Sequence, residues 1–274
     1  LAAGLQQNVI QEDTLFKNLP KKIKCAGRSI SEYDMDIPSS LTAEEILIRS
    51  GNIGSIKIAQ KVGLENFRKF LEDLDLISKT QFDIEEVGNP IPFKWGKCKL
   101  ATSAYGHGIT TTPLQLAKGY AIIANGGYKI KPTLIKKELN VKKGEQIISE
   151  ENSSKNNKIL RKIVTSEQGT ANLANIIGYE IAGKTGTAQK SIKGKYSKKK
   201  INTFASIFPV SDPKYVLIVL LDEPKLSKTY IYEYNIDGKK TKIVGTPFNT
   251  AGWTSVEVAK NIIEKIGPIL AIKY

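Results

Sequence analysis

The sequence predicts an α+β fold in which an antiparallel sheet is flanked by helices. Capped and amphipathic helical segments fill residues 1–165, and three consecutive strand patterns with a final amphipathic helix fill residues 178–274. With 274 residues, 41% of them hydrophobic, the chain is long enough to bury a substantial core. We therefore expect a single domain over 1–274, with a mainly helical part and a part built on the sheet.

The first helices are predicted by their end signals. Thr42 and Glu45 have capping-box spacing in front of apolar residues at helical intervals, which predicts a helix over 41–49. Ser50-Gly51-Asn52 interrupts this pattern, and a second helix over 53–62 is expected to stop at Gly63. Ser50 and Asn52 are thus expected on a short loop between two helices, where they would also serve as C-cap and N-cap.

Further helices are predicted over 64–76 and from Pro113 to about residue 124. Thr112 and Pro113 form an N-cap followed by a proline at the first helical position, and the apolar surface that follows indicates a buried helix. Residues 142–158 carry little hydrophobic signal, so a long surface connection is expected there.

The sheet is predicted from alternating and apolar runs over 178–189, 203–208 and 215–221. A Lys/Gly/Ser loop over 190–200 and the turn Ser211-Asp212-Pro213 would join them as an antiparallel meander. Residues 230–234 and 240–244 would extend the sheet or form a surface hairpin. Thr250 is expected to cap a last helix from about Trp253 to Ile266 that packs on the sheet.

The net charge of +14 comes from 41 Lys+Arg against 27 Asp+Glu, spread along the chain. A basic surface is the simplest interpretation, contact with an anionic lipid or wall polymer is the second, and nucleic acid is the third. Cys25, Cys98 and His107 lack the spacing of a metal site or of a disulfide framework, so the cysteines leave the redox compartment open. No metal and no organic cofactor is expected.

Two short motifs point to chemistry: Ser50-x-Asn52 between two helices, and Lys184-Thr185-Gly186-Thr187 on a strand. In this order they match the second and third motifs of serine acyl-transferases that act on penicillins. Three further segments, over 105–117, 169–171 and 205–209, strengthen the match. Together they resemble the transpeptidase domain of class B penicillin-binding proteins over nearly the whole chain, and Thr250-Ala251-Gly252-Trp253 resembles the division-specific branch.

The resemblance implies a role for each motif residue. Ser50 would relay a proton and Asn52 would hydrogen-bond the bound peptide, while Lys184 would attract the substrate carboxylate. Thr185 and Thr187 would offer hydroxyls to that carboxylate, and the backbone N–H of Thr187 would be an oxyanion-hole donor. Gly186 would let the substrate lie along the strand as an added edge.

The resemblance also implies a nucleophilic serine in an S-x-x-K motif, and this motif is missing from its expected place. Leu1 to Leu5 resemble the end of the helix that the motif opens, so we expect the nucleophile and its lysine to precede Leu1 and this piece alone to be inactive. A literal S-x-x-K at Ser197–Lys200 lies in the basic segment after the strand motif and is discounted.

The implied parent protein is a serine-type D,D-transpeptidase that cross-links peptidoglycan and binds β-lactams. It would be held at the bacterial inner membrane by an amino-terminal anchor, with the catalytic domain on the periplasmic side. Its partners would be stem peptides ending in D-Ala-D-Ala and other wall-synthesis or division proteins, without nucleic acid. A non-catalytic wall-peptide or division-partner module of the same fold and a β-lactamase or penicillin sensor remain as alternatives.

A nucleotide site is a further alternative, because residues 178–185 match the P-loop pattern G-x-x-x-x-G-K-[ST]. A P-loop needs a strand that ends at the first glycine and a helix that begins at the lysine. Here the predicted order is reversed, since a helical stretch precedes Gly178 and a strand follows it. ATP or GTP binding is therefore disfavoured.

Overall fold

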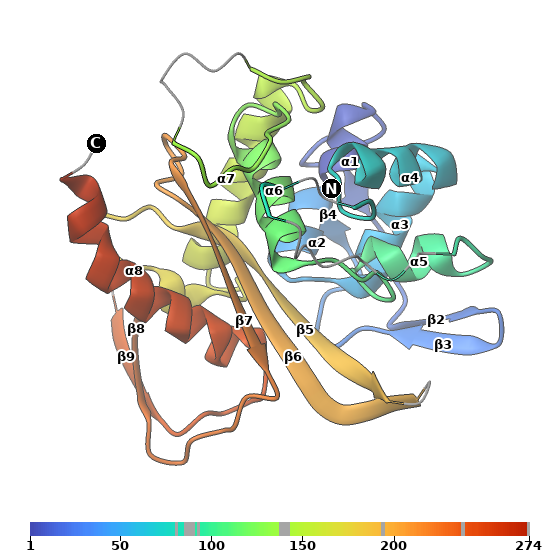
Figure 1. Cartoon of the computed structure of the whole chain (residues 1–274). Helices are drawn as coiled ribbons and strands as arrows, with labels where there is room; N and C mark the ends of the chain where they lie inside the picture. The colour runs from blue at the N-terminus through green and yellow to red at the C-terminus, as the bar shows by residue number, and fades with distance from the viewer. Residues whose placement is uncertain are drawn as a thin grey trace. The chain divides into compact units, whose positions relative to one another are not determined.

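The computed structural model describes residues 1–79, 82–84, 91, 94–136, 143–192, 195–236 and 239–272. The chain divides within one helix into two compact units, Leu1–Ile159 and Leu160–Tyr274, and each is described by itself. Helices and antiparallel strands are both present, which agrees with the predicted α+β class (Figure 1). None of the helices in the described part of the chain is long and apolar enough to cross a membrane.

Unit 1 is mainly helical, with short antiparallel strand pairs. Its elements are α1 (Ala2–Gln6), β1 (Leu15–Phe16), β2 (Lys22–Cys25), β3 (Arg28–Ser31), β4 (Leu41–Thr42), α2 (Ala43–Ile48), α3 (Asn52–Val62), α4 (Leu64–Asp73), α5 (Lys99–Ala104), α6 (Pro113–Ala124) and the first part of α7 (Glu150–Thr165). The predicted capping box of Thr42 and Glu45 is confirmed at the start of α2, and Thr112 is the N-cap of α6 as predicted. Gln115 completes a second capping box at the start of α6. Gly63 ends α3 with a φ of 83°, as its position predicted.

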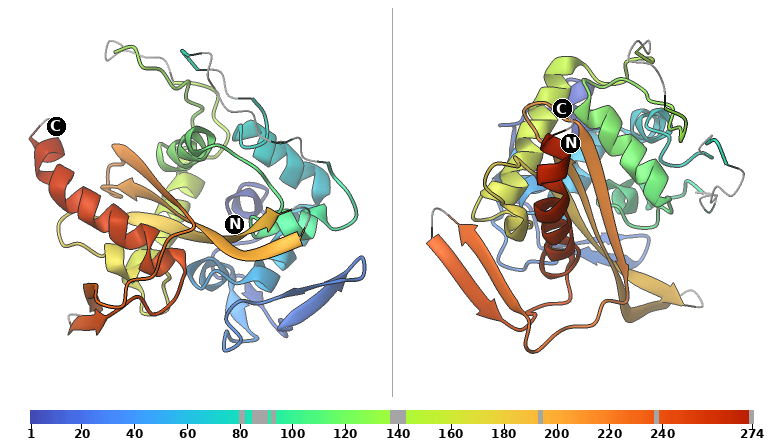
Figure 2. Two further views of the ribbon diagram at one scale, coloured as in Figure 1. Left: turned by 60° about the horizontal axis from the view of Figure 1, so that its bottom comes forward. Right: turned by 60° about the vertical axis from the view of Figure 1, so that its left-hand side comes forward.

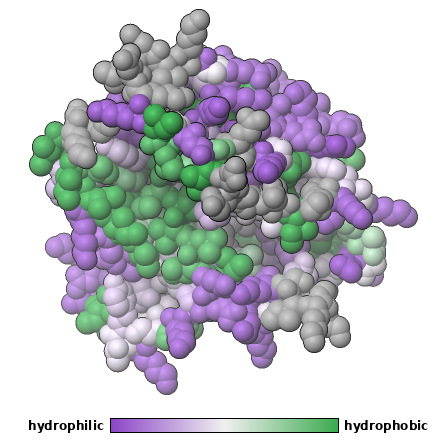
Figure 3. Space-filling view, in the orientation of Figure 1, coloured by the Kyte–Doolittle hydropathy of each residue, from purple (hydrophilic) through white to green (hydrophobic). Residues whose placement is uncertain are grey.

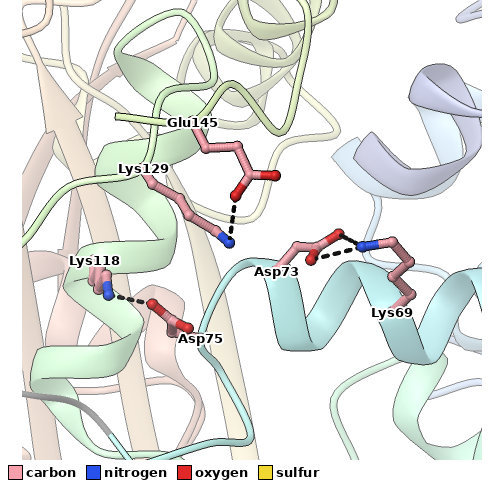
Figure 4. A network of polar contacts seen from close by, with 6 residues as sticks. All are labelled: Lys69, Asp73, Asp75, Lys118, Lys129 and Glu145. Atoms are coloured by element: carbon pink, nitrogen blue, oxygen red, sulfur yellow. Dashed lines mark hydrogen bonds and ion pairs between the residues drawn. The ribbon is translucent and has the colours of Figure 1, made fainter. Parts of the chain in front are cut away.

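Buried polar groups tie α6 to the segment after α4. Gln115 is fully buried, and its side-chain amide donates to the backbone oxygens of Asp75, at 3.1 Å, and of Ser78. Lys118 on α6 forms an ion pair with Asp75, as Figure 4 shows beside the i,i+4 pair of Lys69 with Asp73 on α4. Lys129 reaches Glu145 in the same region (Figure 4). The contacts of Gln115 and Lys118 hold the start of α6 against the segment that follows α4.

The expectation of a long surface connection over 142–158 is wrong, because α7 begins at Glu150. The polar residues that hid this helix are themselves buried: Ser153 and Asn157 are 2% and 7% exposed. The Ser153 hydroxyl donates to the backbone oxygen of Ile123 at 2.6 Å, and the Asn157 amide donates to that of Ala124 at 3.1 Å. Both side chains satisfy backbone carbonyls at the end of α6. This buried face of α7 is therefore polar, and the hydrophobic spacing that usually predicts a helix is absent from it.

The stretch before residue 40 also contains more structure than predicted. Strands β2 and β3 form an antiparallel hairpin in the register Lys22↔Ser31 to Cys25↔Arg28. A disulfide joins Cys25, at the turn end of this hairpin, to Cys98, the N-cap of α5, with Cα atoms 5.9 Å apart. It closes a sequence separation of 73 residues within unit 1. The hairpin is thus covalently tied to α5.

Unit 2 is built on a three-stranded antiparallel sheet in the order β5 (Ala182–Ile192), β6 (Lys195–Phe208), β7 (Tyr215–Asp222). The predicted meander is confirmed, although the first hairpin is longer than expected: β5 and β6 continue through most of the residues predicted as a loop. The register pairs Lys184 with Ala205 and Thr187 with Asn202. Strand β5 is therefore at one end of the three-stranded order.

The rest of unit 2 supports this sheet. It comprises η1 (Asn172–Ala174), the hairpin of β8 (Ile231–Ile236) and β9 (Lys239–Val244), η2 (Ala251–Trp253) and α8 (Ser255–Ala271). Helix α8 runs along one face of the sheet, and the β8–β9 hairpin is a separate two-stranded sheet (Figure 2). The last helix begins at Ser255, later than predicted, with Thr254 rather than Thr250 as its N-cap. Figure 3 shows apolar surface over this part of the unit. Leu220 on β7 and Ile269 on α8 are among the exposed large hydrophobic residues of unit 2.

Candidate active site

The Ser50-Gly51-Asn52 motif is the connection between α2 and α3, both in unit 1. Ser50 has a φ of 59°, which is the left-handed region that glycine usually occupies after a helix. Its N–H donates to the Leu47 oxygen at 3.2 Å, and the next N–H, of Gly51, donates to the Ile46 oxygen at 2.9 Å. This is a Schellman turn with serine at the left-handed position. A serine costs more in this conformation than the glycine that is usual there.

Asn52 is the first residue of α3 rather than its N-cap, which is Gly51. Its side-chain amide donates to the backbone oxygen of Ser31 at 2.9 Å. This contact fixes the amide against the end of β3 and leaves the side-chain oxygen as the group that can accept a hydrogen bond from a ligand.

The cap of α3 comes from Glu32, a residue that the sequence did not suggest. One carboxylate oxygen accepts the N–H of Asn52 at 2.7 Å and the other accepts the N–H of Ile53 at 2.8 Å. Glu32 is 7% exposed, and Gly51 has no side chain with which to cap the helix. A buried carboxylate from the adjacent hairpin thus satisfies two N–H groups at the positive end of α3 and holds the motif in place.

Replacing Glu32 by Gln is expected to lower the free energy of unfolding by about 2 kcal/mol, because an amide NH₂ would face one of the two helix N–H groups. Urea unfolding measures the change. Glu65→Gln is the matched control, since Glu65 is an exposed acid in the first turn of α4. That control should stay within about 0.5 kcal/mol of the wild type. Equal losses in the two variants would contradict the capping role of Glu32.

Lys184, Thr185, Gly186 and Thr187 lie together on β5 in unit 2. Among the described strands, β5 pairs only with β6, so its other edge carries backbone groups that an extended peptide can join. Gly183 and Gly186 differ in why they lack a side chain. A Cβ on Gly183 would lie 2.5 Å from the Ala205 oxygen, whereas a Cβ on Gly186 would meet nothing closer than 3.9 Å. Packing within the sheet therefore requires Gly183 but does not require Gly186.

The side chains of this strand motif are held by neighbours in unit 2. The Lys184 ammonium donates to the Thr185 backbone oxygen at 3.0 Å and approaches the Thr185 hydroxyl at 3.5 Å. The Thr185 and Thr170 hydroxyls are 2.7 Å apart. The Thr187 hydroxyl oxygen accepts the N–H of Ala251 at 2.9 Å. Burial lowers the pKa of Lys184 to about 8, because desolvation disfavours its charged form.

The segment that reaches Thr187 is itself anchored on β6. Asn202 is fully buried, and its amide donates to the side chains of Asn249 and Thr254, each at 2.9 Å. Lys200 donates to the backbone oxygen of Asn249 at 2.8 Å. The position of η2 against β5 is therefore set by the neighbouring strand.

Comparison with known proteins places this arrangement in a family. The model of the penicillin binding protein transpeptidase domain matches residues 1–244. The chain belongs to this family. Relatives include a probable peptidoglycan D,D-transpeptidase FtsI of Caulobacter vibrioides, 29% identical over all of this chain and 45% of the relative, and stage V sporulation protein D of Bacillus subtilis, 33% identical over 66% of this chain and 30% of the relative. The chain thus spans less than half the length of these two relatives.

Solved structures show the same fold. The transpeptidase domain of penicillin-binding protein 3 from Burkholderia pseudomallei matches 98% of this chain and 76% of its own, with a TM-score of 0.82 and 23% identity. Penicillin-binding protein 3 from Mycobacterium tuberculosis, solved in complex with aztreonam, matches 97% of this chain and 60% of its own, with a TM-score of 0.77 and 24% identity. The predicted fold of the penicillin-binding transpeptidases is confirmed.

The structure also bears on the other interpretations of the sequence. Lys184 and Thr185 lie within a strand rather than at the start of a helix, so the P-loop interpretation fails on geometry. Ser197 lies in β6, which agrees with discounting its S-x-x-K. His107 stacks on Tyr105, with ring centroids 5.7 Å apart, and desolvation together with Lys99 lowers its pKa. The roles predicted for Ser50, Asn52 and Lys184 to Thr187 stay predictions.

Proposed function

We propose that this chain is the substrate-binding body of a serine-type peptidoglycan D,D-transpeptidase. The observation that carries the proposal is the motif on β5. There an ammonium of lowered pKa lies 3.5 Å from the Thr185 hydroxyl, and the strand pairs on one side only among the described strands. A cation and hydroxyl donors suit a terminal carboxylate, and an available strand edge suits an extended peptide.

In this proposal the nucleophile is a serine of the S-x-x-K motif in residues that precede Leu1 in the full-length gene product. Its oxygen attacks the carbonyl of the penultimate D-Ala, and the terminal D-Ala leaves as the amine. An amine of a second stem peptide then attacks the ester, which forms the cross-link and returns the serine. Lys184 and the Thr185 hydroxyl bind the terminal carboxylate, and the Thr187 N–H stabilises the oxyanion. Ser50 relays the proton, and Asn52 holds the peptide amide.

The proposal extends to the setting of the protein. We place the catalytic domain on the periplasmic side of the inner membrane, held by an anchor before Leu1, in the division-specific branch and in contact with other wall-synthesis proteins. The Cys25–Cys98 disulfide supports an oxidising compartment, where such bonds persist. Aztreonam is bound to the M. tuberculosis relative, which supports β-lactams as covalent inhibitors here.

The experiment that tests the function uses the full-length product of the gene and a peptide ending in D-Ala-D-Ala. We expect release of D-alanine and transfer of the remaining acyl group to an added amine, both abolished by prior treatment with penicillin. Repeated hydrolysis of penicillin without peptide turnover would favour a β-lactamase instead. Folded protein that binds the peptide without releasing D-alanine would favour the non-catalytic module.

The pH dependence of acylation by penicillin follows from Lys184. Its ammonium is charged below a pKa of about 8 and loses its charge above it, so attraction for the penicillin carboxylate should fall as the pH rises through 8. The second-order rate constant of acylation, determined at low penicillin concentration over a range of pH, measures this fall. Lys184→Arg, which stays charged, should lose the fall near pH 8. Lys190→Met on the same strand should keep it, because Glu223 and Asp222 raise the pKa of Lys190. An unchanged profile in Lys184→Arg would refute the assignment.

A further inference from the structure

Thr170 stands out because it touches the strand motif and has no role in the mechanism above. It lies in unit 2 between α7 and η1, and its hydroxyl oxygen is 2.7 Å from that of Thr185. Neither hydroxyl is exposed enough to be fully hydrated, since both residues are half-buried. A contact of this length between two hydroxyls is a hydrogen bond in which one donates its proton to the other.

The backbone next to Thr170 is held by hydrogen bonds and by close packing on both sides. The Ala171 N–H donates to the Ile163 oxygen at 3.2 Å, and the Asn172 amide donates to the Ser166 oxygen at 2.7 Å. On the other side, a Cβ on Gly252 would lie 2.7 Å from the backbone oxygen of Thr170. The chain at Thr170 is therefore clamped between the end of α7 and η2, and close packing at Gly252 leaves it little freedom to move.

The direction of the Thr170–Thr185 hydrogen bond decides what Thr185 can do for a ligand. A hydroxyl has one proton and two lone pairs, so a Thr185 hydroxyl that donates to Thr170 has no proton for an anion. The Lys184 ammonium lies 3.5 Å from the Thr185 hydroxyl oxygen and favours an orientation in which a lone pair of that oxygen faces it. If Thr170 is the donor, both lone pairs of Thr185 are engaged and its proton points elsewhere.

Thr187 follows the same rule with a donor of known direction. The Ala251 N–H can only donate, so the Thr187 oxygen is the acceptor and its proton remains for another partner. Thr185 and Thr187 are two residues apart on a strand, so their side chains share one face. With Thr170 as donor, two hydroxyl protons on this face are oriented by contacts from outside the strand.

We propose that Thr170 is a positioning residue that donates its hydroxyl proton to Thr185, so that the Thr185 hydroxyl donates to the carboxylate of the bound substrate or β-lactam. The inference rests on the proposed function for the identity of that carboxylate. Thr170 acts on binding, because the carboxylate is held in the same way in the bound ligand and while its carbonyl is being attacked. The loss of this contact should therefore affect affinity far more than the rate of the chemical step.

The test measures acylation of the full-length protein by a fluorescent penicillin across a range of concentrations. Thr170→Val keeps the shape but removes the donor, and we expect it to raise the half-saturating concentration about tenfold with a limiting rate within about twofold of the wild type. Thr170→Ser restores the hydroxyl and should restore affinity. Thr165→Val is the matched control, since this hydroxyl on α7 bonds only the Arg161 oxygen among the described contacts, and it should leave both constants unchanged.

A double-mutant cycle separates this role from a purely structural one. If Thr170 acts through Thr185, then Thr170→Val should have no further effect in a Thr185→Val background. Multiplying effects in the double variant, or a Thr170→Ser variant as impaired as Thr170→Val, would overturn the proposal. Thr170→Ala replaces the valine variant if the latter does not fold.

Equilibrium binding of a peptide ending in D-Ala-D-Ala, measured in parallel, keeps this inference distinct from the proposed enzyme activity. One outcome is that the wild-type protein is never acylated, while the Thr170→Val variant binds the peptide about tenfold more weakly than the wild type. This would refute the proposed enzyme activity and support the role of Thr170. An unchanged peptide affinity in Thr170→Val would overturn the role of Thr170, whether or not the protein is acylated.

Discussion

Replacing Lys184 by Met is expected to lower acylation of the full-length protein by penicillin about a hundredfold or more, without lowering the melting temperature at pH 7. The loss follows from removing the cation that stands beside Thr185 and attracts the carboxylate. The stability follows from desolvation: a lysine whose pKa is lowered to about 8 is costly to keep charged in the folded state.

The sign of the stability effect depends on pH in a way that can be checked. The folded pKa of about 8 lies below the ordinary value of 10.5, so the unfolded chain holds the proton more strongly. The cost of charged Lys184 is complete below pH 8 and disappears as the pH rises to about 10.5. Lys184→Met should therefore gain in melting temperature over the wild type at pH 7 and lose that gain near pH 10.5. Lys190→Met is the control for stability, since it should not raise the melting temperature.

The acylation measurement tests the mechanism separately. If Lys184→Met is acylated as fast as the wild type, Lys184 has no role in the mechanism.

Replacing both Cys25 and Cys98 by Ser is expected to lower the free energy of unfolding by about 4 kcal/mol. A bond that closes a loop of 73 residues restricts the unfolded chain by about this amount in the chain-entropy estimate. The same bond holds the β2–β3 hairpin, which is followed directly by Glu32 and so by the cap of the Ser50 motif. Its loss should therefore weaken the site as well as the fold.

Urea unfolding with and without a thiol reductant measures this contribution. Reduction should bring the wild type down to the stability of the double serine variant, and should leave that variant unchanged. Equal stability of the oxidised wild type and the variant would show that the disulfide does not stabilise unit 1.

The elements that the sequence predicted well are those with local signals. The capping box at Thr42, the N-cap at Thr112 and the stop at Gly63 depend on residues close together in the sequence, and the structure places helix ends there. The alternating and apolar strands of unit 2 likewise predicted the meander. Helix α7 was missed because Ser153 and Asn157 are buried by hydrogen bonds rather than by hydrophobic contact.

The candidate site divides in the same way. The motif residues themselves were found by resemblance, and the structure puts Ser50 at the turn between α2 and α3 and Lys184 on β5 as expected. The residues that support them could not be found, because their partners are distant in sequence. Glu32 caps a helix that starts 20 residues later, and Cys25 bonds to a cysteine 73 residues away. Gly51, the N-cap of α3, has no side chain that could cap the helix. This was the one local hint that a distant residue such as Glu32 caps it.

The central claim, that this chain belongs to an acylating enzyme, is tested most directly by the intact mass of the full-length protein after incubation with penicillin. We predict the mass of a single penicillin added to each folded chain, and little or no addition in Lys184→Met under the same conditions. Folded wild-type protein whose mass does not change at saturating penicillin would contradict the claim.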